Sequence, residues 1–315
     1  MDALSDVLRA LRISGGVFLE AAFTAPWCVV SRVGPEDFPD RDELPPSVVG
    51  FHYVVDGEMV VQIDGATPVV VRAGEMVLLP RNDPHLLASE AGLPPANPDP
   101  PVQRDEGGLL RIVYGGGGAP TRLVCGYIGT EVRHHPLLEA LPTALALDVK
   151  SKPGAEWVAA SFRFAAQEVS SGRAASETVL AKLSELLFVE AVRHYAETLP
   201  PERKGWFAAL RDPAVGRALA LMHARVAHDW TTDELATAVN LSRSAFAERF
   251  SQLVGAPPIT YLTDWRMQLA AARLRDTPRS IGQIAAELGY ESEATFTRAF
   301  KRANGLAPGK YRNGR

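Results

Sequence analysis

Several side chains in the N-terminal half of this 315-residue chain have the chemistry of a transition-metal ligand set. They are His52, His85, Cys125 and His135, or its neighbour His134 in place of His135. Imidazole nitrogen and thiolate sulfur suit Zn²⁺ or another divalent transition metal. The spacings are long, however, and no CxxC or HxxxH pattern accompanies them. The alternative is that both histidines are hydrogen-bonded interior residues and that Cys125 is a small buried apolar side chain.

The same histidines also predict a small-molecule pocket. If His52 faces the interior beside His85, two imidazoles and nearby aromatic side chains can hold a small organic or anionic effector. We expect the effector-binding residues to be Trp27, Phe51, His52 and His85. Small β-barrels are often filled by their own side chains, so a purely structural interior is the alternative.

Strands must position these residues, and the sequence from about residue 16 to residue 80 predicts them. This region is rich in Val and aromatic residues, and Gly and Pro interrupt it at short intervals. Such a pattern is typical of an all-β sandwich or barrel. The predicted strands are 17–23, 48–57, 59–65, 68–74, 76–80 and, as the last one, 121–128, which follows a glycine turn at 115–118.

Helices are predicted at the start of the chain and after about residue 150. Leu4, Val7, Leu8 and Leu11 share one helical face. Two further helices are predicted at 154–170 and 174–198, and the segment 199–205 breaks the second one as a linker. The apolar faces of this pair exceed what one hairpin needs, so we expect a dimer surface here. The alternative is that the pair packs on the outside of the barrel in a monomer.

The charge of the chain is divided unevenly along it. The net charge is −4, but residues 201–315 carry 17 Lys and Arg against 11 Asp and Glu, a net of +6. The preceding residues carry 16 against 26, a net of −10, which points to different partners for the two parts. The start lacks a secretion signal, there are two cysteines and no apolar run is long enough to span a bilayer. We therefore expect a cytoplasmic protein that does not enter the membrane.

The last hundred residues contain an internal repeat. Sliding the sequence by 50 positions aligns five residues of the first copy with identical residues of the second. The pairs are Phe246/Phe296, Phe250/Phe300, Gly255/Gly305, Pro258/Pro308 and Tyr261/Tyr311. Just upstream the offset is 49, so the second copy has one extra residue in its inter-helix turn. Each copy predicts a helix, a tight turn and a second helix, which is helix-turn-helix geometry.

Helix-start signals agree with this interpretation. Thr231 with Glu234, and Ser280 with Gln283, have the spacing of a capping box. Ser242 and Ser292 are placed to cap the second helix of each copy, and residues 259–275 predict a long helix between the copies. A rigid helix of this kind would let both second helices reach successive major-groove segments of double-stranded DNA. One such hairpin alone would more often be an ordinary helical hairpin.

The helical phase selects the side chains that face DNA. The repeated phenylalanines must face the core of each copy, which leaves the opposite face exposed. The residues expected to contact DNA are Arg243, Ser244, Ala247 and Glu248 in the first copy and Thr295, Arg298, Lys301 and Arg302 in the second.

These residues differ in the contact that their chemistry suits. Arg298 suits a bidentate contact to guanine, and Thr295 suits a thymine methyl group. Glu248 either accepts a hydrogen bond from cytosine N4 or is solvated. The cations expected on phosphates are Lys301, Arg302, Lys310 and Arg312.

The repeat region closely resembles the DNA-binding domain of AraC/XylS-type transcriptional regulators. The resemblance covers about residues 206–315 and rests on LSRSAFAERFSQLVGAPPITYLTDWRMQLAAARL and IGQIAAELGYESEATFTRAFKRANGLAPGKYR. It implies two helix-turn-helix modules bridged by one long helix. The chain departs from the family pattern at Asn240, where glycine often stands in the first turn.

The β region resembles the cupin-type effector domain that precedes such DNA-binding domains. GEMVLLPRNDPH resembles the second cupin motif, and FHYVVDGEMVVQIDG resembles the first with only His52 of its usual histidines. An enzyme-type cupin generally needs three or four metal ligands, so this loss favours sensing over catalysis.

Together these observations predict an α+β multidomain protein. Its parts are a cupin-like β-barrel sensor at 1–150, a helical linker and dimerisation region at 151–205, and an all-α domain with two helix-turn-helix modules at 206–315. The predicted function is that of a non-enzymatic, effector-responsive transcription regulator. Its predicted partners are double-stranded DNA, a small-molecule effector, a second copy of itself and the transcription machinery. The alternatives are a cupin metalloenzyme with a helical appendage and an architectural DNA-binding protein with a ligand-free barrel.

Overall fold

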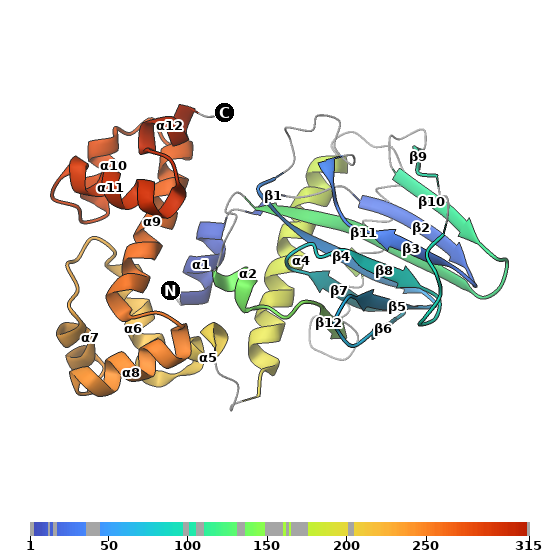
Figure 1. The fold of residues 1–315 in the computed structure, drawn as a ribbon, viewed down its shortest axis with the longest axis horizontal. Helices are drawn as coiled ribbons and strands as arrows, with labels where there is room; N and C mark the ends of the chain where they lie inside the picture. The colour runs from blue at the N-terminus through green and yellow to red at the C-terminus, as the bar shows by residue number, and fades with distance from the viewer. Residues whose placement is uncertain are drawn as a thin grey trace. The chain divides into compact units, whose positions relative to one another are not determined.

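The computed structural model describes residues 3–11, 13–14, 18–35, 45–96, 101–104, 110–130, 136–148, 160–161, 164, 176–200 and 205–313. The chain divides into two compact units (Figure 1). One comprises Met1–Leu11 with Ala196–Arg315, and the other comprises Arg12–Tyr195. The predicted boundaries at residues 150 and 205 stay a prediction. The grouping of the first eleven residues with the C-terminal part has no counterpart in the sequence pattern.

The unit Arg12–Tyr195 is built on two sheets, as the α+β prediction requires. The larger has eight strands in the order β12-β7-β4-β11-β2-β10-β9, with β1 paired to β11, and the smaller has the order β3-β8-β5-β6. All pairs are antiparallel except β10 with β2. The strands are β1 (Ile13–Ser14), β2 (Phe18–Thr24), β3 (Cys28–Ser31), β4 (Ser47–Asp56), β5 (Glu58–Ile63), β6 (Val69–Arg72), β7 (Glu75–Leu79), β8 (His85–Ala88), β9 (Gln103–Arg104), β10 (Leu110–Gly115), β11 (Pro120–Thr130) and β12 (Leu145–Asp148).

One apolar core joins the two sheets. Phe23 and Leu123 from the larger sheet belong to the same cluster as Met59 and Val61 from the smaller sheet. The predicted strands are present as β2, β4, β5, β6, β7 and β11. The prediction that 121–128 is the last strand is wrong, because β12 follows it and pairs with β7. The segments β3, β8 and β12 have four residues each, too few to show a clear alternation in the sequence.

The glycine run 115–118 forms the turn before β11, as predicted, but the strand β10 that precedes it was not predicted. A Cβ on Gly116 would lie 2.5 Å from Cδ of Pro26, and one on Gly118 would lie 2.6 Å from the carbonyl oxygen of Ala25. The run therefore packs directly on the turn after β2, which leaves no space for side chains on these two residues.

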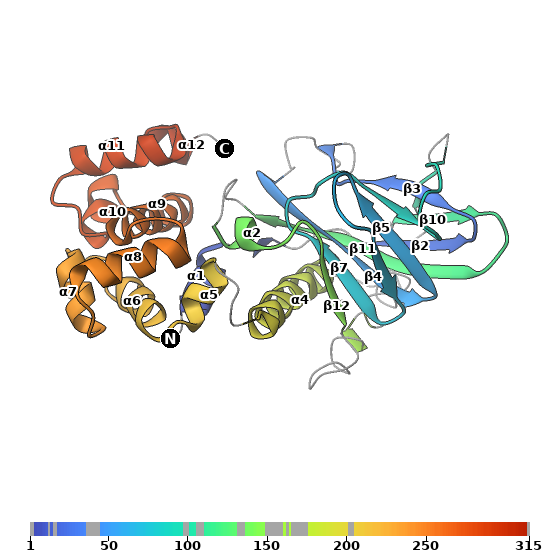
Figure 2. The same cartoon turned by 60° about the horizontal axis from the view of Figure 1, so that its bottom comes forward.

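Two helices accompany the sheets: α2 (Pro136–Ala140) and α4 (Ser176–Thr198). The prediction of a helix at 174–198 is confirmed, whereas most of the predicted helix at 154–170 lies outside the described residues. In α4, Phe188 and Val192 are buried, while Val179 and Leu186 are 41% and 49% exposed. Figure 2 shows α4 alongside the larger sheet, in agreement with Figure 1.

The helical unit contains the predicted repeat. Its helices are α5 (Trp206–Arg211), α6 (Pro213–Ala224), α7 (Thr232–Ala238), α8 (Arg243–Val254), α9 (Pro258–Asp276), α10 (Ile281–Glu287), α11 (Glu293–Asn304) and α12 (Pro308–Asn313). Phe246 and Phe250 lie in one apolar cluster, and Phe296 and Phe300 lie in a second. None of the helices in the described ranges is long and apolar enough to cross a membrane.

The predicted N-terminal helix is present as α1 (Ala3–Leu11) and packs within the helical unit. Val7 and Leu11 are buried, and Ala3 belongs to the cluster that contains Phe246. Asp6 Oδ2 lies 3.9 Å from Nδ1 of His223 on α6. The apolar face seen in the sequence therefore exists, but it covers the helical unit.

Candidate functional site

The first helix-turn-helix module consists of α7, a short turn and α8. The Thr231 side chain accepts from the Glu234 N–H while Glu234 reaches back to the Thr231 N–H, which confirms the capping box. Ser242 caps α8 by accepting from the N–H of Ala245 at 3.3 Å. In the turn, Asn240 has a φ of 57°, which asparagine adopts more readily than most residues.

The second module repeats this design with α10 and α11. Ser280 and Gln283 form the second capping box, and Ser292 caps α11 by accepting from the Thr295 N–H at 3.2 Å. The linking helix α9 begins at Pro258 and ends at Asp276, one residue beyond each end of the prediction. Caps, turn and linking helix thus lie where the repeat placed them.

The predicted DNA-facing residues lie on the outward face of each second helix. The four phenylalanines are fully buried. The predicted contact residues are all exposed except Ala247, which is half-buried. Arg298 Nη2 donates to Thr295 Oγ1 at 3.2 Å, one turn earlier on the same face. Arg243 lies 3.7 Å from Asp233, and Glu248 Oε1 accepts from Gln252 at 3.1 Å.

Arg312, which was predicted to contact a phosphate, donates hydrogen bonds within the protein. Arg312 donates to the carbonyl oxygens of Leu274 at 3.2 Å and Arg279 at 2.6 Å, so its guanidinium holds α12 on the end of α9. Arg312 was predicted to contact DNA because it lies in a basic segment. Its carbonyl partners could not be recognised from the sequence, since they are more than thirty residues away. Lys310 is exposed, and its assignment stays a prediction.

The sequence did not predict the side-chain contact that holds α8 against α6. Arg249 on α8 forms an ion pair with Asp212, which caps α6. The Asp212–Pro213 pair carried a usable signal, because Asp before a Pro at the first helical position is typical of a helix start. No local pattern announces the partner, which lies 37 residues away.

His52 and His85 lie side by side inside the unit Arg12–Tyr195, here called the β unit. The prediction of a small-molecule pocket required this arrangement. Both are buried, and their Nε2 atoms lie 2.8 Å apart. Burial lowers the pKa of His52 well below 6.5, with His85 as a second cause, and burial also lowers the pKa of His85. Both rings are therefore neutral at neutral pH.

The hydrogen bonds assign the two tautomers. His85 Nδ1 lies 2.9 Å from the carbonyl oxygen of Asp83, so this nitrogen must donate. The Nε2 atom of a neutral His85 is then an acceptor, and Nε2 of His52 donates to it. Among the described residues, His52 Nδ1 is a buried acceptor without a hydrogen-bond partner, and Trp27 Nε1 is a buried donor without one.

The remaining members of the predicted sets lie as follows. Cys125 is the register partner of His52 across β11 and β4, and burial raises its pKa to about 12. Trp27 is in the shared core and stacks on Phe23 with ring centroids 4.2 Å apart. Phe51 is buried, and it lies on the face of β4 opposite to that of His52, because consecutive residues of a strand point to opposite faces.

The predicted metal set is not assembled by the described residues. His135 lies outside them, and within them no group of three or more His, Cys, Asp or Glu side chains could hold a metal ion. The direct hydrogen bond between His52 and His85 also occupies the two nitrogens that would coordinate a shared ion. The described donors His52, His85 and Cys125 therefore do not fit a metal centre.

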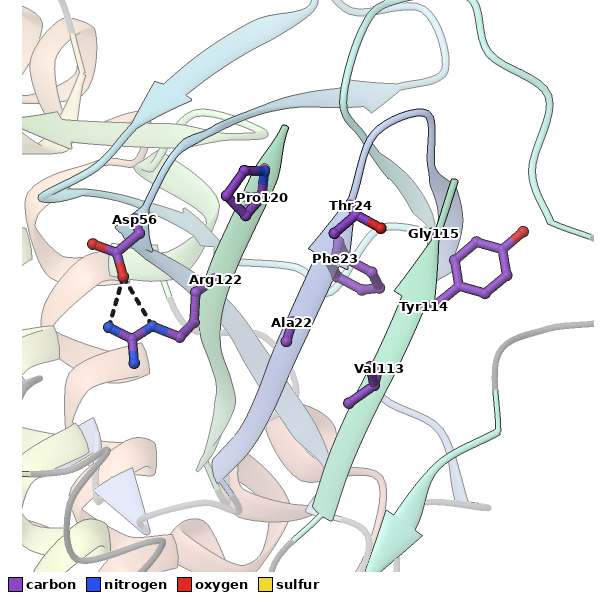
Figure 3. A pocket seen from close by; sticks show the side chains of 10 residues that line it. Ala22, Phe23, Thr24, Asp56, Val113, Tyr114, Gly115, Pro120 and Arg122 are labelled. Carbon is purple, nitrogen blue, oxygen red and sulfur yellow. Dashed lines mark hydrogen bonds and ion pairs between the residues drawn. The ribbon is translucent and has the colours of Figure 1, made fainter. Parts of the chain in front are cut away.

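The surface cavities that described residues of the β unit line include the following two. The larger, of about 660 Å³, lies at the ends of β2, β10 and β11 (Figure 3). Phe23 and Tyr114 line it. Arg122 and Asp56 also line it, and they form an ion pair in which Nη2 lies 2.6 Å from Oδ2. A second cavity of about 420 Å³ is lined in part by His85. Sequence reasoning missed the first cavity because its lining comes from separate strand ends.

Comparisons with known proteins match both units. Residues 2–197 match a family model described as cupin, and residues 235–314 match one described as a helix-turn-helix domain. A protein named as an AraC-like transcription regulator from Streptomyces antibioticus is 33% identical over 99% of this chain and 98% of its own length. The RCS-specific HTH-type transcriptional activator RclR of Escherichia coli is 26% identical over 99% of this chain and 97% of its own. The crystal structure of a transcriptional regulator with an AraC-type DNA-binding domain from Chromobacterium violaceum is 29% identical over 32% of this chain and 90% of its own, with a TM-score of 0.31.

Proposed function

Because this chain belongs to the AraC-like transcription regulators with an N-terminal cupin domain, and so is a DNA-binding regulator, we propose that it reads DNA with α8 and α11 under the control of a small-molecule effector. The observation that carries the DNA contact is the repeated exposure pattern. In each module the phenylalanines are buried and the opposite face of the second helix is exposed. That face carries the predicted contact residues.

The two helices contribute different chemistry to DNA recognition. Arg298 is the guanine-reading residue, and its hydrogen bond to Thr295 holds it toward the exposed face. Lys301 and Arg302 continue this face and bind phosphates, which orient α11 in the groove without reading bases. Arg243, Ser244, Ala247 and Glu248 form the corresponding surface of α8.

The effector site is the interior around His52, His85 and Trp27. Within the described part of the chain, His52 Nδ1 and Trp27 Nε1 are each a buried hydrogen-bonding group without a partner, which suits a neutral organic molecule that carries a donor or an acceptor. A neutral imidazole pair has no positive charge with which to hold an anion, so the anionic option in the sequence prediction is less well supported. A purely structural interior is the competing possibility.

The parts of the chain divide these tasks. The strands within residues 1–150 form the sensor, since α1 packs in the helical unit. Residues 206–315 form the DNA-binding part, and residues 151–205 connect the two parts and contribute a dimer surface. Support for the dimer surface comes from the exposed Val179 and Leu186 on α4. We further propose that the protein contacts the transcription machinery and catalyses no reaction, since its relatives are regulators.

Genome-wide mapping of bound DNA with the wild-type protein and with the Arg298→Ala variant tests the proposal. We expect discrete sites for the wild type, and for the variant weaker occupancy of those sites with a relaxed preference at one base position. Small molecules handled by the products of neighbouring genes are then tested for thermal stabilisation of the purified protein. Light scattering with and without a bound site reports the dimer. Uniform, sequence-independent occupancy would instead indicate an architectural protein.

A further inference from the structure

The turn between α10 and α11 lies directly against the loop that joins α6 to α7. Gly289 in this turn has a φ of +79°, and a Cβ added to it would lie 2.3 Å from the carbonyl oxygen of Ala227 and 3.0 Å from its Cα. Cβ atoms essentially never approach backbone so closely. The backbone of the second module therefore touches the loop that leads into the first module, with no side chain between them.

The internal repeat shows that turn conformation alone does not require this glycine. The equivalent residue of the first module is Asn240, which has a φ of 57°. Asparagine tolerates this left-handed conformation, so it would serve in the second turn if conformation were the whole requirement. The close approach of Ala227 is the additional constraint at Gly289.

Arg266, in the middle of α9, contacts both sides of this junction. Its Nε donates to the carbonyl oxygen of Val226 at 2.9 Å, and its Nη2 donates to that of His228 at 2.8 Å. Its Cζ lies 5.8 Å from the ring centroid of Tyr290, the residue after Gly289. One side chain of the linking helix thus contacts both the α6–α7 loop, which leads into the first module, and the turn of the second module.

The apolar cores of the two modules meet at the same place. Val226 packs against the cluster that contains Phe246 and also against the cluster that contains Phe296. The modules are therefore joined by α9 and by a packed contact beside it. A single helix can bend, but two connections resist bending and rotation together.

We propose that this junction fixes the separation of α8 and α11, so that Gly289 and Arg266 are positioning residues for DNA recognition. The inference rests on the proposed function, in which both helices read DNA. If α8 and α11 are held rigidly, the two DNA sequence elements that they contact must lie at one fixed spacing. Insertion of one base pair displaces one element by about 3.4 Å and rotates it by about 35° relative to the other.

The test compares spacing preference between matched variants of the full-length protein. The probe is a duplex selected from a random library by the wild type, together with the same duplex carrying one base pair inserted between its two elements. Gly289→Ala is compared with Gly305→Ala, because Gly305 has a similar φ of +75° but no atom within 4 Å of an added Cβ. Circular dichroism and thermal unfolding verify the fold of each variant.

We expect the wild type and Gly305→Ala to bind the inserted probe about tenfold more weakly than the selected one. Gly289→Ala should bind the selected probe about tenfold more weakly and distinguish the two probes by less than about threefold. Arg266→Met should behave like Gly289→Ala, and it provides the same measurement if that variant does not fold. Arg266→Lys should restore part of the preference, because an ammonium group can still donate to a carbonyl.

Two results would count against the inference in different ways. If folded Gly289→Ala and Arg266→Met keep the wild-type ratio between the probes, the junction does not set the spacing. If the wild type itself binds both probes equally, the premise that both helices read DNA at a fixed spacing fails.

Discussion

Arg249 donates two hydrogen bonds to one carboxylate oxygen of Asp212, at 2.8 and 2.6 Å. The other oxygen of Asp212 accepts from the N–H groups of Ala214 and Val215 at 3.0 and 2.9 Å. A single carboxylate thus caps α6 and holds α8 against it.

Replacement of Asp212 should separate these two roles. Asp212→Ala loses the cap and the ion pair, and we expect the free energy of unfolding to fall by about 1–2 kcal/mol. Asp212→Ser keeps a capping oxygen and should lose less than about 1 kcal/mol, because the half-exposed Arg249 contributes little. Urea unfolding followed by helical circular dichroism measures both. Equal losses for Ala and Ser would mean that the ion pair, and not the cap, stabilises this corner.

The helical unit should lose stability in mild acid through His223. This side chain is buried against Tyr261 and Trp265, and burial lowers its pKa to about 4 although Asp6 lies 3.9 Å away. An unfolded histidine titrates near 6.5. The contribution is therefore complete above about pH 6.5 and is lost as the pH falls toward 4, by about 3 kcal/mol in total. Unfolding of wild type and His223→Gln across this range tests the expectation, and parallel pH profiles for the two proteins would contradict it.

Arg298 and Arg302 should affect DNA binding in different ways. Arg298→Ala should cost about 1–3 kcal/mol on the best site and relax the preference at one base position. Arg302→Ala should weaken all sequences about equally, because a phosphate contact carries no sequence information. Binding to a panel of singly substituted duplexes gives both profiles. Uniform weakening by Arg298→Ala would remove its assignment to a base.

DNA affinity should fall steeply with salt, although the chain as a whole is acidic. The C-terminal part carries the net positive charge of +6 that meets phosphate. Each neutralised phosphate makes the slope of log affinity against log salt concentration steeper by about 0.9. The slope of Lys301→Ala should therefore be about one unit shallower than that of the wild type, measured as affinity across a salt series. An unchanged slope would place Lys301 away from the phosphates.

The His52–His85 pair should behave as one unit in the stability of the β unit. Either His→Leu substitution leaves one buried imidazole nitrogen unpaired, at a cost of about 1–3 kcal/mol. The double substitution removes both partners, so its cost should be smaller than the sum of the two single costs. A double-mutant cycle by chemical unfolding measures this difference. Strict additivity would show that the hydrogen bond between the rings contributes little.

The sequence by itself determined most of the helical unit. Thr231 and Ser280 indicate helix starts because each pairs with a residue only three positions later. The spacing of the four phenylalanines indicates which face of each helix is buried. These signals are local, so they can be interpreted without knowing what packs against them. The exposed faces of α8 and α11 followed directly from that phase.

Only the tertiary structure decided how distant segments combine. It paired His52 with His85, and it placed α1 in the helical unit. It also showed that Gly289 rests on Ala227. The physical reason is that such contacts depend on which surfaces meet after folding, whereas neighbouring residues reveal only which surface each element has to offer.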